Sequence, residues 1–326
     1  MEIKSLLIRH VHMKTIRMST AFLGALFLIA AGIATAHPEH DSKSSIPISF
    51  EPSIVGHIGL DGGFNFAKEG EGSNNFTDKA SVPFSGLNLS ITLPKRNNFL
   101  MTVDGDFRWD GFKNSGDFDS NEDPFWQYNV GFHVLKQLNE DSRAGVFFNY
   151  GDTKSQDEPA EEEYNVLMGG FEAHHFLYDD LMLYTQIGYG HKGRDGDQKN
   201  EGFAGGLVSR WGATYFMSET SSFNVDLEFS STYNYIDGSD PGRFFGTTLT
   251  YKTQPWEDSP MIMSLFGRMD HYSSTDESET MDEWQLGFGM KYYYGAGSQM
   301  EAARKGASLG MPRLPTRASA WTEWMD

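Results

Sequence analysis

Between Pro52 and Tyr294, apolar and polar residues alternate in runs of about ten residues, and polar breaks separate the runs. Alternation of this kind places successive side chains on opposite faces of a β-strand. In the run 99–109, Val103 and Phe107 fall on one face, whereas Asp104 falls on the other. The pattern predicts twelve strands, at 53–66, 83–93, 99–109, 125–135, 143–151, 164–173, 181–190, 202–215, 223–235, 243–253, 261–270 and 283–294.

The breaks between these strands alternate in character. Those after the even-numbered strands are compact, at 94–98, 136–142, 174–180, 216–222 and 254–260. Those after the odd-numbered strands are mostly longer and more acidic, at 67–82, 110–124, 152–163, 191–201, 236–242 and 271–282. An even number of strands, joined by short and long connections in turn, favours an antiparallel up-and-down β-barrel that spans a membrane.

A soluble β-sandwich is the alternative fold, since its apolar faces can pack against each other. In a membrane barrel, the apolar faces meet lipid and the polar faces line the lumen. Large aromatic residues lie on the apolar faces near the strand ends, which suits the two membrane interfaces. These residues are Trp109, Trp126, Tyr150, Trp211, Tyr235, Trp284 and Tyr294. We therefore expect an all-β fold, a transmembrane antiparallel barrel.

Composition narrows the functional classes. Asp and Glu number 45 against 26 Lys and Arg, which gives a formal net charge of −19. Such an acidic chain is unsuited to non-specific binding of nucleic-acid phosphates. Because the chain has no cysteine, disulfides, thiolate metal sites and covalent c-type haem are excluded.

Residues 1–36 have the order of features of a secretory signal peptide. Basic residues precede an apolar run at 21–34, and a small-residue site follows at 34–36. The run is too short for a membrane-spanning helix, which needs about 20 residues, and a start at Met13 would give a signal of ordinary length. The predicted organisation is a signal peptide at 1–36, a periplasmic N-terminal segment at 37–51, a barrel at 52–294 and a periplasmic tail at 295–326.

With this signal and these strands, the chain resembles Gram-negative outer-membrane β-barrel proteins of the porin-like type. The resemblance covers the signal and residues 53–294, and it rests on pattern rather than on a motif. It implies a place in the cell outer membrane with both termini in the periplasm, contact with outer-membrane lipid and lipopolysaccharide, and insertion by the barrel-assembly machinery. Such proteins commonly end on the last strand, whereas here a tail follows Tyr294. Disorder of the tail and insertion as a plug are both open, and Trp321 and Trp324 motivate the plug.

The predicted inner faces carry both acidic and basic residues. In a pore, such charges act on passing solutes, whereas in a closed barrel they pair and fill the lumen. Inner-face glycines favour the pore: Gly59, Gly63, Gly131, Gly188, Gly206, Gly287 and Gly289. We expect a passive pore for small hydrophilic solutes, with Asp104, Asp106, Asp226 and Glu228 giving a mild cation preference. The alternative is a closed structural or adhesive barrel with acidic surface loops. The predicted pore-lining residues are Asp104, Asp106, Arg108, Arg143, Arg210, Asp226, Glu228, Arg268, Glu283 and Lys291.

Within the acidic break 110–124, oxygen-bearing residues alternate in a way that resembles the start of a calcium loop. They are Asp117, Asp119, Asn121 and Asp123. Oxygen ligands at this spacing suit a hard cation, but Glu122 stands where such a loop has glycine, and Tyr128 where it has a bidentate glutamate. The simpler interpretation is a solvated acidic loop that binds divalent cations loosely, and we expect no other cofactor.

A surface lipolytic enzyme is a weaker alternative. His271 and Ser273 have the His-x-Ser spacing of outer-membrane phospholipase A, which is similar in being a twelve-stranded barrel. A histidine near a serine can act as a general base when a third group orients it. The Asn-Gly and Gln-Ser signatures that usually follow the serine are missing, since Ser274 and Thr275 come next. We therefore expect no enzymatic activity.

Overall fold

The computed structural model describes residues 54–71, 79–95, 98–111, 125–155, 164–192, 205–233, 242–256, 259–274 and 279–313. These residues all belong to one compact unit, 51–326. Their elements are the strands β1 (Val55–Glu71), β2 (Lys79–Lys95), β3 (Phe99–Asp110), β4 (Phe125–Gln137), β5 (Ser142–Ser155), β6 (Tyr164–Tyr178), β7 (Leu181–Lys192), β8 (Gly205–Phe216), β9 (Ser221–Tyr233), β10 (Gly242–Thr253), β11 (Met261–Ser274) and β12 (Glu279–Tyr294), and the short helix α2 (Gln299–Arg304).

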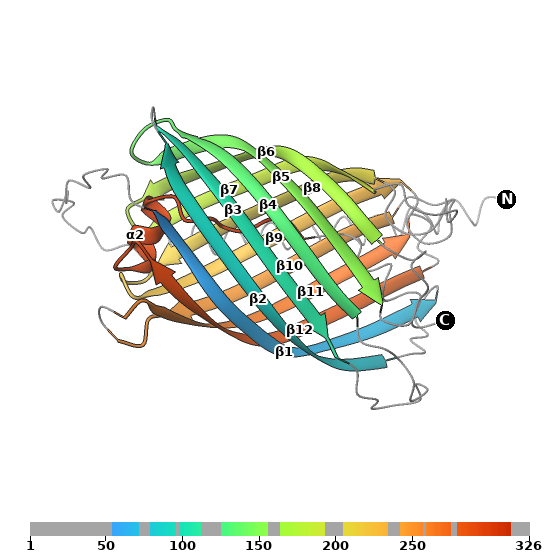
Figure 1. Cartoon of the computed structure of the whole chain (residues 1–326). Coiled ribbons are helices and arrows are strands. Elements are labelled where there is room, and N and C mark those ends of the chain that lie inside the picture. The colour runs from blue at the N-terminus through green and yellow to red at the C-terminus, as the bar shows by residue number, and fades with distance from the viewer. Residues whose placement is uncertain are drawn as a thin grey trace, which may run out of the picture. The chain divides into compact units, whose positions relative to one another are not determined.

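Each strand pairs antiparallel with its neighbours in the sequence, and β1 pairs with β12, so the sheet closes into a barrel (Figure 1). The closing seam extends from Gly56 opposite Tyr294 to Glu71 opposite Glu279. Because a closed sheet has no free edge, its backbone N–H and C=O groups are satisfied without water. The predicted fold class and the predicted twelve strands are confirmed.

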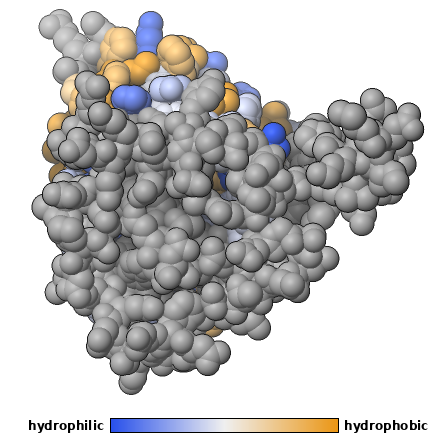
Figure 2. Space-filling view, turned by 90° about the vertical axis from the view of Figure 1, so that its right-hand side faces the viewer, coloured by the Kyte–Doolittle hydropathy of each residue, from blue (hydrophilic) through white to orange (hydrophobic). Residues whose placement is uncertain are grey.

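Side chains alternate between an outer and an inner wall. In β1, the outward Ile58, Leu60 and Phe64 are 53%, 56% and 55% exposed, while the inward His57 and Asn65 are buried. This distribution is the reverse of that in a soluble protein and suits an outer wall that meets lipid. In Figure 2, which views the barrel from the end opposite α2, apolar side chains of the outer wall are orange along the upper edge. Among the described residues, no helix is long and apolar enough to cross a membrane.

The two ends of the barrel differ in their connections. The end at which α2 lies, here called the short-turn end (Figure 1), carries the connections 96–98, 138–141, 179–180, 217–220 and 254–260. The other end, here called the long-loop end, carries 72–78, 111–124, 156–163, 193–204, 234–241 and 275–278. The longer connections lie at the long-loop end as predicted, except that 275–278 is shorter than 254–260 at the other end and 72–78 equals it in length.

The turn predicted at 174–180 was wrong for most of its length. β6 continues to Tyr178, and only 179–180 lie between β6 and β7. The alternation persists through the predicted break, because His174 is buried on the inner wall and His175 is exposed on the outer wall. A pair of polar residues therefore need not end a strand whose inner face is itself polar.

After β12, the chain turns into α2. The hydroxyl of Ser298 accepts a hydrogen bond from the Glu301 N–H at 3.1 Å, and the Glu301 carboxylate accepts one from the Gly297 N–H at 2.6 Å. This reciprocal capping stabilises the start of a helix that is too short to be stable alone. Just beyond the helix, Gly306 has a φ of 91°, a conformation that glycine adopts without steric cost.

The residues 295–313, here called the C-terminal segment, pack into the short-turn end of the barrel. Ala302 and Ala307 form a buried cluster with Val55 of β1. Met300, Ala303 and Leu309 pack against a second cluster, which consists of the inward side chains Phe176, Met182, Tyr184 and Phe216. The segment is therefore part of the barrel's own packing.

Candidate functional site

The inner wall is the candidate functional site, because there charged side chains lie at mid-strand. Every residue predicted to line a pore lies on this wall: Asp104, Asp106, Arg108, Arg143, Arg210, Asp226, Glu228, Arg268, Glu283 and Lys291. The alternation of each strand fixes this placement, since the outward neighbours of these residues carry the apolar surface. Their effect on passing solutes stays a prediction.

At the short-turn end, Arg143 of β5 holds the end of α2. Its Nη2 donates hydrogen bonds to the carbonyl oxygens of Ala303, at 2.8 Å, and Arg304. Its Nε donates to Gln137 Oε1 at 2.8 Å, which orients the guanidinium group. Arg143 is 3% exposed. A buried cation placed on the free carbonyls of a helix C-terminus is favourable both as a hydrogen-bond donor and through the helix dipole.

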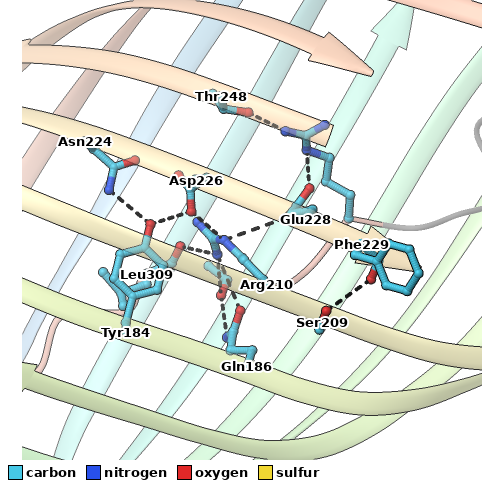
Figure 3. A network of polar contacts seen from close by, with 12 residues as sticks. Tyr184, Gln186, Ser209, Arg210, Asn224, Asp226, Glu228, Phe229, Thr248 and Leu309 are labelled. Carbon is cyan, nitrogen blue, oxygen red and sulfur yellow. Dashed lines mark hydrogen bonds and ion pairs between the residues drawn. The ribbon is translucent and has the colours of Figure 1, made fainter. Parts of the chain in front are cut away.

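Farther along the lumen, the wall binds the backbone of the C-terminal segment (Figure 3). Arg210 Nη1 donates to the carbonyl oxygen of Leu309 at 2.9 Å, and Gln186 Nε2 donates to that of Gly310 at 3.0 Å. Arg210 is fixed on the wall by Asp226, whose Oδ1 lies 2.7 Å from Arg210 Nε. Wall side chains thus satisfy backbone groups of a segment that belongs to no strand.

The segment also contributes a charged side chain to the lumen. Arg313 Nε lies 2.6 Å from Glu228 Oε2 of β9. Arg313 Nη1 donates to Asp270 of β11, and Nη2 donates to the hydroxyl of Thr248 of β10. The guanidinium carbon lies 6.0 Å from the centre of the Phe244 ring. Three neighbouring strands therefore converge on one guanidinium group.

A third contact joins the segment to a buried histidine. His133 of β4 lies between two carboxylates, with Nδ1 at 2.7 Å from Glu172 Oε1 and Nε2 at 2.8 Å from Asp104 Oδ2. The same Asp104 oxygen accepts a hydrogen bond from the hydroxyl of Ser308. Asp104 therefore links the wall network of β3, β4 and β6 to the C-terminal segment.

Toward the long-loop end, the wall has its own pairs. Arg108 Nε lies 3.0 Å from Asp110 Oδ2. Its Nη2 donates to Asn65 Oδ1 at 2.9 Å, and its Nη1 donates to Gln285 Oε1 at 3.2 Å. The guanidinium carbon stacks 4.0 Å from the centre of the Phe84 ring. These groups bridge β12, β1, β2 and β3 without the C-terminal segment.

Comparison with known proteins agrees with this architecture. Neither protein-family models nor the sequences of curated proteins match the chain. An outer-membrane channel from Pseudomonas putida F1 superposes with a TM-score of 0.55 at 10% identity, with 79% of this chain and 100% of that chain covered. The chain has an outer-membrane β-barrel fold.

Further solved structures were found with lower scores. The outer-membrane channel DcaP of Acinetobacter baumannii has a TM-score of 0.39 at 10% identity, covering 74% of this chain and 96% of that one. The KdgM porin in complex with disordered oligogalacturonate has a TM-score of 0.39 at 9% identity, covering 72% and 98%.

The four acidic residues expected to set a cation preference differ in accessibility within this barrel. Asp104, Asp226 and Glu228 are buried and hold His133, Arg210 or Arg313. Asp106 alone among the four is exposed, although it lies on the inner wall. Water and ions that enter the lumen can therefore reach Asp106 more directly than the other three.

Inner-face glycines leave less room than expected. A Cβ atom on Gly131 would lie 2.1 Å from Cε of Met311 in the C-terminal segment, and one on Gly287 would lie 2.3 Å from the Phe266 ring. Larger side chains therefore lie over these two glycines. At these two positions, the absent side chain allows close packing in the lumen rather than open space.

Several expectations fall on other parts of the chain. Asp117, Asp119, Asn121 and Asp123 lie outside the described residues, as do Trp321 and Trp324. Within the described part, no group of three or more His, Asp or Glu side chains is arranged to hold a metal ion.

The His-x-Ser pair lies on the outer wall near the long-loop end. Asp282 of β12 is opposite His271, and its Oδ1 lies 2.7 Å from His271 Nδ1. A carboxylate does orient the histidine, but in the described part of the chain Ser273 makes no hydrogen bond to it. The arrangement thus lacks the contact by which a histidine activates a serine.

Sequence reasoning missed the contacts made by the C-terminal segment. The wall residues Gln186, His133 and Glu172 could have been found, since alternation places them on the same face as the predicted charges. Ser308 and Arg313 gave no such signal, because the segment has no strand periodicity.

Proposed function

We propose that the protein is an outer-membrane channel for small hydrophilic solutes with a mild preference for cations, and that the C-terminal segment narrows its lumen. The observation that carries the proposal is the pairing of the charged inner wall with a segment that is not part of the sheet. In a barrel that is closed by its wall alone, the wall charges would need only one another as partners. Here some of them bind a separate segment, which can leave the lumen without breaking the sheet. In this proposal the short-turn end and both termini face the periplasm, as short connections do in such barrels.

The expected dimensions support a pore once the segment is removed. Twelve strands spaced about 4.8 Å apart and tilted by about 40° close into a wall with a radius of about 12 Å. Side chains reach inward by about 5 Å, half the spacing of packed sheets. A passage of about 14 Å is then left, wide enough for a small hydrated solute. One extended chain in this passage, itself about 5 Å by 10 Å, leaves room for little more than water and small ions.

Conductance in a planar bilayer tests the proposal. The refolded chain 37–326 should show small or rare discrete openings, and a variant that lacks residues 296–326 should show larger steps. The reversal potential across a salt gradient should lean toward cations. If neither protein conducts, although both are folded and inserted, the channel is refuted. Equal conductance from the two would instead refute the role of the C-terminal segment.

A closed structural barrel is the second candidate, and three ion pairs within the wall favour it. They join Arg108 to Asp110, Arg210 to Asp226, and Arg268 to Asp270. If such pairs block the lumen by themselves, removal of the C-terminal segment leaves the barrel silent. The structural candidate then also predicts a loss of outer-membrane integrity on deletion of the gene.

A further inference from the structure

The pocket around Arg313 has the form of a binding site for a guanidinium group. Each nitrogen of the group has its own partner: Nε meets Glu228, Nη1 meets Asp270, and Nη2 meets the hydroxyl of Thr248. The ring of Phe244 lies 6.0 Å from the guanidinium carbon, within the range of a cation–π interaction. These three acceptors match the three nitrogens of a guanidinium group, whose fork of donors distinguishes arginine from lysine.

The acceptors and the aromatic ring of the pocket all belong to the wall. Glu228, Asp270 and Phe244 are 5%, 0% and 5% exposed, and they come from the adjacent strands β9, β11 and β10. Arg268 of the wall pairs with the other oxygen of Asp270, which fixes the carboxylate and leaves Oδ1 to Arg313. Side chains held in this way are already oriented for a ligand.

The charge of the wall leaves room for one more cation. Four buried carboxylates lie here, those of Asp226, Glu228, Asp270 and Glu283. The wall supplies three cations, since Arg210 pairs with Asp226, Arg268 pairs with Asp270, and Lys252 also acts on Asp226. Arg210 lies 3.7 Å from Glu228, farther than its 2.7 Å contact with Asp226. Removal of Arg313 would therefore leave buried negative charge without a close partner, which is costly.

Next to the pocket, the wall also binds carbonyl groups. Arg210 and Gln186 donate to the carbonyl oxygens of Leu309 and Gly310, a few residues before Arg313. A ligand with a guanidinium group at one end and amide carbonyls at the other would satisfy both features. This is the chemistry of arginine amides and of short arginine-containing peptides.

We propose that Glu228, Asp270, Thr248 and Phe244 form a guanidinium-binding site in the lumen, that Arg313 occupies it at rest, and that arginine-type solutes take it by displacing Arg313. The proposal rests on the channel function proposed above, and it names the class of solute. The C-terminal segment then acts as an internal competitor for the solute site. Because Arg313 and a solute cannot occupy the site at the same time, a solute that binds here also weakens the docking of the segment.

Calorimetric titration of the folded chain 37–326 in detergent tests the site directly. The probe is N-acetyl-arginine amide, and N-acetyl-lysine amide, of the same charge, is the control ligand. An Arg313→Ala variant should bind the arginine probe roughly tenfold or more tightly than the unaltered chain, because its site is no longer occupied. It should also prefer the arginine probe over the lysine probe at least about tenfold, since the three donors of a lysine ammonium all lie on one nitrogen and cannot reach acceptors that are spread around a guanidinium group.

Two further variants make the test specific. Lys136→Ala removes a cation that is exposed on the outer wall and contacts the ring of Phe99 rather than the pocket or the segment, so this variant should bind the probe with the affinity of the unaltered chain. Arg313→Ala combined with Thr248→Val should lose part of the preference for arginine while it keeps both carboxylates and the fold. Equal binding of the two probes by Arg313→Ala, or no binding to the folded variant, overturns the site.

Failure of the site and failure of the channel are distinguishable. Larger conductance of Arg313→Ala without arginine binding would overturn the guanidinium site and leave the channel intact. Specific arginine binding to a barrel that never conducts would keep the site and overturn the channel.

Discussion

Substitution of Arg143 by alanine should release the C-terminal segment from the short-turn end of the barrel. Arg143 is buried and donates to two carbonyl oxygens at the end of α2, those of Ala303 and Arg304. Hydrogen bonds from a charged donor contribute about 1.5–3 kcal/mol each. Loss of both therefore weakens docking of the segment by about 3–6 kcal/mol, which raises the ratio of undocked to docked segment by a factor on the order of 10²–10⁴.

Single-channel recording measures this ratio as the fraction of time spent in the larger conductance state. Arg143→Ala should raise that fraction strongly, while the size of the open step should equal that of the variant without residues 296–326. Lys136→Ala is the matched control, because Lys136 lies at the same end of the barrel but is exposed on the outer wall. An unchanged open fraction in a folded Arg143→Ala barrel, or the same increase in Lys136→Ala, would refute the reasoning.

The remaining predictions concern ion preference, packing and pH. Asp106→Asn should shift the reversal potential away from cations without changing the open fraction, because Asp106 is exposed on the inner wall; a shifted open fraction would contradict this. Gly131→Val should raise the open fraction, since a Cβ at this position would lie 2.1 Å from Met311. Addition of Met311→Ala to this variant should bring the open fraction back down. Partial burial raises the pKa of Glu301, but the Lys305 ammonium and backbone N–H groups outweigh it and lower the pKa overall. Docking of α2 should therefore be strongest above the ordinary glutamate pKa of about 4.3 and should weaken as the pH falls through the lowered pKa of Glu301. Glu301→Gln should remove this part of the pH dependence of the open fraction.

The period-two pattern predicted the barrel because the environment imposes it on every strand. Lipid outside and water or polar groups inside require opposite side chains at successive positions, as Ile58 and Leu60 show against His57 and Asn65. The same rule put the charged residues on the inner wall. The predicted turn at 174–180 was wrong because two polar residues in a row indicated a break, although His174 and His175 continue the alternation.

The pairing of these charges could not be predicted in the same way. Arg313 meets Asp270 and Glu228 only because the barrel closes around the C-terminal segment. Neither the spacing along the chain nor a repeat connects these residues. The glycine at 131 illustrates the same limit, since a missing side chain indicates space but does not say that Met311 will fill it.

The position of α2 immediately after β12 limits how long the C-terminal segment can stay out of the lumen. β12 ends at Tyr294 and the helix begins at Gln299, so the segment that binds the inner wall is tethered to the rim by a few residues. A short tether gives a binding partner an effective concentration in the millimolar range. A free peptide of the same sequence would have to reach that concentration to occupy the barrel equally well. Since the segment cannot diffuse away, each release should end in rebinding, and openings should come in brief bursts whose duration depends on the tether.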